Sequence, residues 1–191
     1  ITIFGLSYAV TNLNLPRSLV LGAIALGAVG ELITIPLFGA LSDRLGRRPI
    51  YMLGCLAAIA LSFPIFWGIG TRDPMIVTLS FVIGMSVGHG IMYGVQASFL
   101  SEMFPSNLRY SGASLGYQLA APIGGGLVPL AAAALVGGMH GATWPVSLLM
   151  IAIALVTMFA VMTAKETAPA IGKIRSRAPA AALSTDLRMP S

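Results

Sequence analysis

The sequence predicts an all-α membrane protein, and three observations support this. Apolar residues make up 57% of the 191 residues and charged residues only 9%, whereas a soluble domain carries about 25% charged residues. The apolar residues form runs of roughly 20 residues, the length that a helix needs to cross a bilayer. The densest charge cluster before the C-terminal tail is very short, which predicts a tight turn between two such helices. This composition excludes a soluble enzyme.

Residues 1–164 are predicted to form a six-helix transmembrane bundle, followed by a disordered cytoplasmic tail over 165–191. The tail is rich in Ala, Pro, Ser and basic residues and has no apolar period. The fifth span contains Pro122, Gly124–Gly126 and Pro129, which predict a weakened or locally unwound helix. The chain opens inside an apolar run without Met, so we expect a fragment whose first helix is truncated. The predicted spans are 1–11 (partial), 17–40, 49–68, 75–99, 112–136 and 145–164.

The basic residues predict the orientation in the membrane, because Lys and Arg resist translocation. With alternating spans, one side has only Arg17 and Arg72. The other side is therefore predicted to be cytoplasmic, with the C-terminus. The net charge of +5 then reflects topology and is no sign of a nucleic-acid partner. The single Cys55 excludes an intramolecular disulfide. The predicted cytoplasmic set is Arg44, Arg47, Arg48, Arg109, Lys165, Lys173, Arg175, Arg177 and Arg188.

The charged turn at 39–48 has the pattern G-x-x-x-D-R-x-G-R-R, formed by Gly39, Asp43, Arg44, Gly46, Arg47 and Arg48. It resembles the signature of the major facilitator superfamily. The stretch 102–118 resembles the junction between helices 10 and 11 in the metabolite:proton symporter branch. That branch includes carriers for shikimate, 2-oxoglutarate, citrate, and proline or betaine. The resemblance implies the C-terminal half of a twelve-helix transporter in a bacterial inner membrane, with a missing N-terminal half as its partner.

The resemblance also implies a gate at the cytoplasmic ends of the helices. In the family, the acid and the arginines of this motif form an ion-pair network that breaks when the carrier opens inward. The resemblance implies the same role for Asp43 and the arginines of the motif here. Glu102 and Arg109 are predicted partners of this network, because both follow the fourth span on the same side. Other interpretations stay open. The arginines can serve only to orient the protein, Glu102 and Arg109 can be solvated, and Asp43 can cap a helix N-terminus.

Ionisable side chains inside a span are costly and point to function. Glu31 and His89 are the two candidates. Helical spacing places Met85, His89, Tyr93 and Gln96 on one face of the fourth span, which predicts a polar cavity that binds an organic acid. His89 can instead make one structural hydrogen bond, and Glu31 can pair with the missing half. In the fifth span, Gln118 either reaches the cavity or ties helices together.

These observations predict a secondary active transporter: proton-coupled symport of a small organic acid or zwitterionic metabolite by alternating access. No metal-ligand cluster, phosphate-binding loop or nucleophile elbow is present in the sequence, so we expect neither an enzyme nor a cofactor. A titrating carboxylate or histidine would couple transport to protons. Two alternatives remain: a sugar or drug carrier of another branch of the superfamily, and a non-transporting sensor with the same fold.

Overall fold

The computed structural model describes residues 2–139 and 141–167. Most of the described residues are helical and none of them forms a strand, which confirms the predicted all-α class. Two long helices change to π-helical winding in their middle, at η1 and η2. The elements in order are α1 (Thr2–Thr11), α2 (Arg17–Leu45), α3 (Arg47–Gly70), α4 (Pro74–Ile83), η1 (Gly84–His89), α5 (Gly90–Glu102), α6 (Arg109–Ala121), η2 (Pro122–Leu127), α7 (Val128–Gly138) and α8 (Trp144–Thr163).

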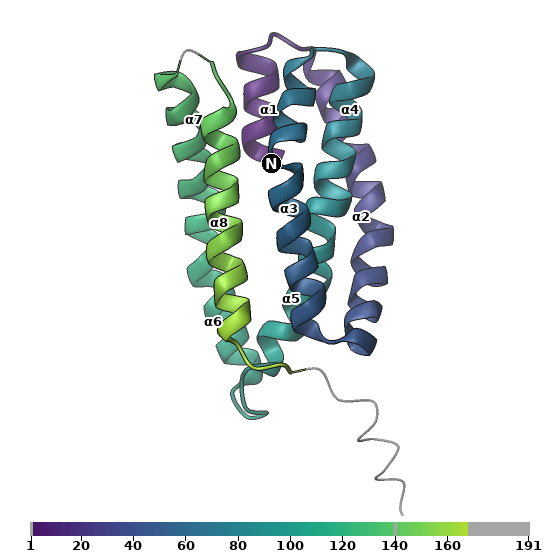
Figure 1. Cartoon of the computed structure of the whole chain (residues 1–191), viewed down its shortest axis with the longest axis vertical. Coiled ribbons are helices and arrows are strands. Elements are labelled where there is room, and N and C mark those ends of the chain that lie inside the picture. Colours follow the sequence, from purple (N-terminus) through teal and green to yellow (C-terminus); the bar gives the residue numbers. More distant parts are fainter. Residues whose placement is uncertain (1, 140, 168–191) are drawn as a thin grey trace, which may run out of the picture.

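The helices stand side by side in an up-and-down bundle (Figure 1). The α2–α3 and α5–α6 connections and the end of α8 lie at one end of the bundle, which we call the motif end. The α1–α2, α3–α4 and α7–α8 connections lie at the other end. α1 covers only the half of the bundle away from the motif end. The five longer helical stretches among the described residues are apolar and long enough to span a membrane, at Arg17–Leu45, Arg47–Gly70, Pro74–Glu102, Arg109–Gly138 and Trp144–Thr163.

The polar motif is mostly helical. α2 continues to Leu45, five residues past the predicted end at 40, and α3 already begins at Arg47. Gly46 alone separates them, with φ 111°, a backbone conformation that glycine adopts without a Cβ clash. Its N–H donates to Ser42 O at 3.0 Å and so closes the last turn of α2. The two helices therefore follow one another almost directly, and the motif side chains lie on two helix ends.

The turn at the opposite end is built around Asp73. Its carboxylate accepts hydrogen bonds from Met75 N at 2.9 Å and Ile76 N at 3.0 Å, which satisfies two of the free amides at the start of α4. Pro74 occupies the first turn, where its missing N–H costs nothing.

Both π-helical segments lie near the middle of their spans. In the fifth span, η2 begins at Pro122 and contains three consecutive glycines. The predicted weakening therefore takes the form of a change in winding, and the helical path from α6 to α7 stays continuous. In the fourth span, Gly90 N–H donates to Met85 O, five residues back. A π-turn rotates the residues after it relative to those before it.

The core consists of two apolar clusters along the bundle. The cluster away from the motif end includes Phe4, Phe66 and Phe81, and the cluster at the motif end includes Tyr51 and Phe99. α8 lies chiefly against α3. Both clusters exclude water from the helix contacts near them. The polar groups described next lie at the boundary and at the motif end of this core.

Candidate functional site

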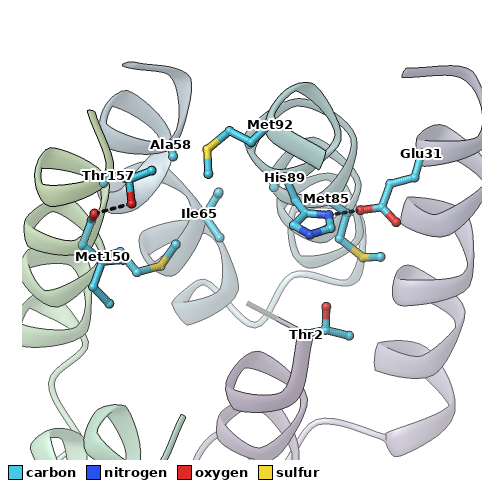
Figure 2. Close-up of a pocket in the computed structure, with 13 residues that line it drawn as sticks. Thr2, Glu31, Ala58, Ile65, Met85, His89, Met92, Met150 and Thr157 are labelled. Carbon is cyan, nitrogen blue, oxygen red and sulfur yellow. Dashed lines mark hydrogen bonds and ion pairs between the residues drawn. The ribbon is translucent and has the colours of Figure 1, made fainter. Parts of the chain in front are cut away.

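A hydrogen-bonded pair of side chains links two helices near the middle of the bundle. His89 Nδ1 lies 2.7 Å from Glu31 Oε1, so the last residue of η1 is joined to α2 (Figure 2). The Glu31 side chain is 18% exposed and the His89 side chain 53% exposed. A carboxylate in such a place needs a partner, because burial disfavours an isolated charge. The imidazole supplies the hydrogen bond and still keeps a free side.

The pair opens into a cavity of about 290 Å³. Figure 2 shows His89 and Glu31 pointing toward one another on one side of it, with Met92, Ile65 and Met150 across from them. Thr2 and Thr157 are its further polar side chains. A mostly apolar pocket with a few convergent polar groups is the usual form of a small-molecule site. The lining residues are Thr2, Glu31, Ala58, Ile65, Gly84, Met85, Gly88, His89, Met92, Met150, Ile153, Ala154 and Thr157.

Aromatic side chains extend the polar group from His89 to another helix. The His89 and Tyr93 rings stack with their centroids 5.0 Å apart. Tyr117 of α6 lies beside Tyr93. Met85, which was predicted to share this face, lies against Gly27 of α2 and lines the same cavity as His89.

A second polar group lies at the motif end and centres on Arg47, whose side chain is 6% exposed. Its guanidinium binds Glu102 through two hydrogen bonds, Nη2 to Oε1 at 3.0 Å and Nε to Oε2 at 3.3 Å. Nη1 contacts Asp43 Oδ1 at 2.6 Å and Ser42 Oγ at 2.6 Å. Such a two-bond arrangement fixes both distance and angle. It ties the α2–α3 hairpin to the end of α5.

Arg48 and Glu166 join α8 to the same hairpin. The Glu166 carboxylate accepts hydrogen bonds from Arg47 N at 2.8 Å and Arg48 N at 3.1 Å. In the reverse direction, Arg48 donates to Val161 O at 3.1 Å and to Met162 O. Each charge thus meets the helix end whose dipole it complements: an acid at the start of α3 and a base at the end of α8.

Sequence reasoning missed Glu166, because it lies in the segment predicted to be a disordered tail. Residues 165–167 are placed, and Thr167 Oγ1 donates to Glu102 Oε2 at 2.7 Å. The remainder of the predicted tail, including Lys173, Arg175, Arg177 and Arg188, lies outside the described residues. The alternative that Asp43 caps a helix is wrong for α3, since Glu166 accepts from its first amides. The one feature of the sequence that could have pointed to Glu166 is its position, an acidic residue two positions after the end of the last predicted span.

Comparison with known proteins identifies the family of this chain. The family model of the Major Facilitator Superfamily matches residues 1–189. The chain belongs to the Major Facilitator Superfamily. The predicted branch is also confirmed, since its relatives are metabolite transporters. With five apolar helices of spanning length among the described residues, it is an integral, multi-pass membrane protein.

The superfamily relatives have bacterial sources. The shikimate transporter of Escherichia coli is 33% identical over 87% of this chain and 38% of its own length. The citrate-proton symporter of Klebsiella pneumoniae is 31% identical over 71% of this chain and 31% of its own. The proline/betaine transporter of Escherichia coli is 35% identical over 73% of this chain and 27% of its own. The chain therefore spans about a third of these relatives. No solved structure matches the chain.

The superfamily motif supplies more than charges. A Cβ on Gly39 would lie 3.2 Å from Gly94 O, so this glycine permits the close approach of α2 to α5. Arg44 and Arg109 are exposed and have no ion pair with a described residue. Of the two predicted partners of the network, the structure therefore brings Glu102 into contact with Arg47 and leaves Arg109 apart.

The two candidate glutamines do not join the His89 pair. Gln96 lines a separate cavity of about 300 Å³ together with Tyr51, Tyr117 and Thr157. Gln118 lines a third cavity, at the motif end of α5 and α6. The structure thus brings Glu31, His89 and Tyr93 together and distributes the glutamines over other surfaces.

Proposed function

We propose that the complete protein is a secondary active transporter that carries a small organic acid or zwitterionic metabolite together with protons. The observation that carries the proposal is the Glu31–His89 pair beside the central cavity. The superfamily assignment and the relatives, which include a citrate-proton symporter, support the same class. Substrate binding near the midplane and alternating access are typical of such carriers.

The pair has the chemistry that proton coupling requires. When His89 is protonated, it is a cation whose exposed side can attract a carboxylate. When it loses the proton, Glu31 keeps the hydrogen bond and the attraction for a substrate anion weakens. Proton binding and substrate binding then favour each other at one place. The apolar wall around Met92, Ile65 and Met150 would bury the remainder of the substrate.

The network at the motif end serves as the gate in this proposal. In the present conformation, Arg47, Arg48, Glu102 and Glu166 connect α3, α5 and α8. Breaking these contacts together would release the helix ends, and a set of contacts that forms or breaks as a unit is a two-state element that a bound substrate can bias.

We expect the motif end to face the cytoplasm of a bacterial inner membrane, because Arg44, Arg47, Arg48, Arg109 and Lys165 lie there while the opposite end has Arg17 and Arg72. On a Cys55→Ala background of the complete protein, a cysteine in place of Thr71 should react with an impermeant thiol reagent in intact cells. A cysteine in place of Ser106 should react only after the membrane is opened. Ser42 is unsuitable, since it is fully buried. Labelling of the Ser106 variant in intact cells contradicts the orientation.

His89→Gln in the complete protein tests the coupling. Glutamine keeps a hydrogen-bonding group beside Glu31 but cannot take a charge at neutral pH. In proteoliposomes with an imposed proton gradient, we expect uphill accumulation of shikimate, citrate or betaine to be lost while exchange of the same substrate down its gradient persists. The substrate is chosen as the one that the unaltered protein accumulates.

Three outcomes contradict parts of this proposal. Normal uphill accumulation by His89→Gln would make His89 a structural residue. Loss of exchange as well as accumulation would assign His89 to binding alone. If the unaltered protein accumulates none of the three compounds and only a sugar or a drug, the proposed substrate class fails.

A further inference from the structure

Two glycines lie directly beside the Glu31–His89 pair, Gly30 before Glu31 and Gly90 after His89. Both belong to helical backbone, Gly30 in α2 and Gly90 at the start of α5. Neither has a positive φ, so neither is required by a turn. What the two share is a close neighbour on the opposite helix. Their lack of a side chain therefore serves the contact between α2 and the fourth span.

The contact between the two helices is reciprocal. A Cβ on Gly30 would lie 3.0 Å from the Cβ of Ser86, and the Ser86 hydroxyl is closer still. A Cβ on Gly90 would lie 3.2 Å from the Cβ of Thr34, again with the hydroxyl closer. Ser86 of η1 thus fills the space at Gly30, and Thr34 of α2 fills the space at Gly90. Each helix contributes one small side chain and one space, and the pair lies between them.

The small side chains cannot leave these spaces. A Cβ atom is fixed by the backbone, so the Cβ atoms of Ser86 and Thr34 keep their places in every rotamer. Ser86 is only 7% exposed, and its hydroxyl donates to Gly27 O of α2 at 3.5 Å. Thr34 Oγ1 donates to Gly30 O at 3.2 Å. A methyl group added to either glycine must therefore push the two helices apart.

The hydrogen bond of the pair depends on this helix separation. His89 Nδ1 lies 2.7 Å from Glu31 Oε1, and such a bond is lost once the two atoms are about 3.6 Å apart. The Glu31 side chain is 18% exposed and packed in place, whereas that of His89 is 53% exposed, so little packing holds the imidazole against the carboxylate. Among the described residues, Tyr93 is the other titratable side chain in contact with His89. A displacement of roughly 1 Å between the helices is therefore enough to break the pair.

We propose that Gly30 and Gly90 are positioning residues for the Glu31–His89 pair. By leaving room for the side chains opposite, they set the helix separation at which the carboxylate and the imidazole form their hydrogen bond. The consequence for coupling rests on the proposed function. With the helices farther apart, His89 would bind its proton and the substrate without the help of Glu31.

The first test is spectroscopic and independent of transport. The complete protein is labelled with ¹⁵N-histidine, and the His89 signal is identified by its loss in His89→Gln. Glu31→Gln gives the position of the Nδ1 signal without the carboxylate. Gly30→Ala should move the signal most of the way to that position. Gly88→Ala is the matched control, because a Cβ there, next to His89, would meet nothing within 4 Å. It should leave the signal in place.

Two further variants separate positioning from a failure to fold. Gly90→Ala makes the same change on the other helix and should move the His89 signal in the same direction. Adding Ser86→Gly to Gly30→Ala removes the side chain that the new methyl group meets, so the signal should return to its original position. The proposal is overturned if neither glycine variant moves the signal, if Gly88→Ala moves it as far, or if Ser86→Gly does not restore it.

Transport measurements distinguish this inference from the proposed function. In proteoliposomes with an imposed proton gradient, Gly30→Ala should slow uphill uptake about tenfold, the effect of losing a hydrogen bond to a charged group. Exchange down the gradient should persist. If the His89 signal moves and uphill uptake is unchanged, the positioning stands and proton coupling through the pair fails. If His89→Gln abolishes uphill uptake but neither glycine variant moves the signal, the proposed function stands and the positioning fails.

Discussion

Replacing Arg47 by glutamine should destabilise the protein more than any other single charge removal at the motif end. The change takes away both hydrogen bonds to Glu102 and the contacts to Asp43 and Ser42. Glu102 is 21% exposed, so its carboxylate would lose its charged partner in a largely buried place and keep only the hydrogen bond from Thr167. Breaking a buried pair in this way costs roughly 3 kcal/mol. The Asp43 contact adds little, because Asp43 is 57% exposed and water screens it.

The measurement is the midpoint of thermal unfolding of the complete protein in detergent. Arg44→Gln is the matched control, since Arg44 is exposed and makes no ion pair with a described residue. It should leave the midpoint nearly unchanged. The double variant Arg47→Gln with Glu102→Gln should recover part of the loss, because the unpaired carboxylate is gone. Equal effects of Arg47→Gln and Arg44→Gln would show that the network contributes nothing to stability.

Gly94→Val should have a comparably large effect, through packing. A Cβ at this position would lie 2.5 Å from Ile35 O and 3.2 Å from Gly39 N. Both atoms belong to the backbone of α2, which cannot rotate away as a side chain can. The helices must therefore separate, and forced overpacking costs about 1–3 kcal/mol. Because Gly39 belongs to the superfamily motif, we also expect a lower yield of folded protein and slower transport.

Gly22→Ala is the control for this substitution. Gly22 lies in α2, and a Cβ there would meet nothing within 4 Å. Alanine is also more favourable than glycine in a helix by about 1 kcal/mol, so the midpoint of thermal unfolding should rise or stay the same. If Gly94→Val leaves the unfolding midpoint at the value of the unaltered protein, the close α2–α5 contact does not limit packing at this point.

The two substitutions test different contacts between the α2–α3 hairpin and α5. Arg47 supplies directional hydrogen bonds between α3 and α5, and Gly94 supplies the space that lets α2 and α5 approach. In a gate that opens and closes, the hydrogen bonds of Arg47 must break and form again, whereas the close packing of α2 against α5 at Gly94 must persist. We therefore expect Arg47→Gln to change the conformational equilibrium, and Gly94→Val to impair folding in every conformation.

The sequence alone determined the class of this protein. Long apolar runs have one stable form in lipid, since the backbone must satisfy its own hydrogen bonds. The spacing of Gly39, Asp43, Gly46 and the neighbouring arginines then identified the superfamily. The length of an apolar run and the spacing of a motif are local properties, so they can be recognised from residues that are close together in the sequence. The bounds of the motif helices were the weaker part, because polarity at 41–45 does not tell a loop from a helix that extends beyond the membrane.

Only the tertiary structure decided which of the polar residues meet. Glu31 and His89 are 58 residues apart, and their contact depends on the packing of α2 against η1. Glu166 binds the start of α3 across more than 100 residues. Such pairs form only when two helices pack side by side with the right rotation about their axes. The helical period of one segment does not say how a neighbouring helix is rotated, so the sequence pattern could not predict these contacts.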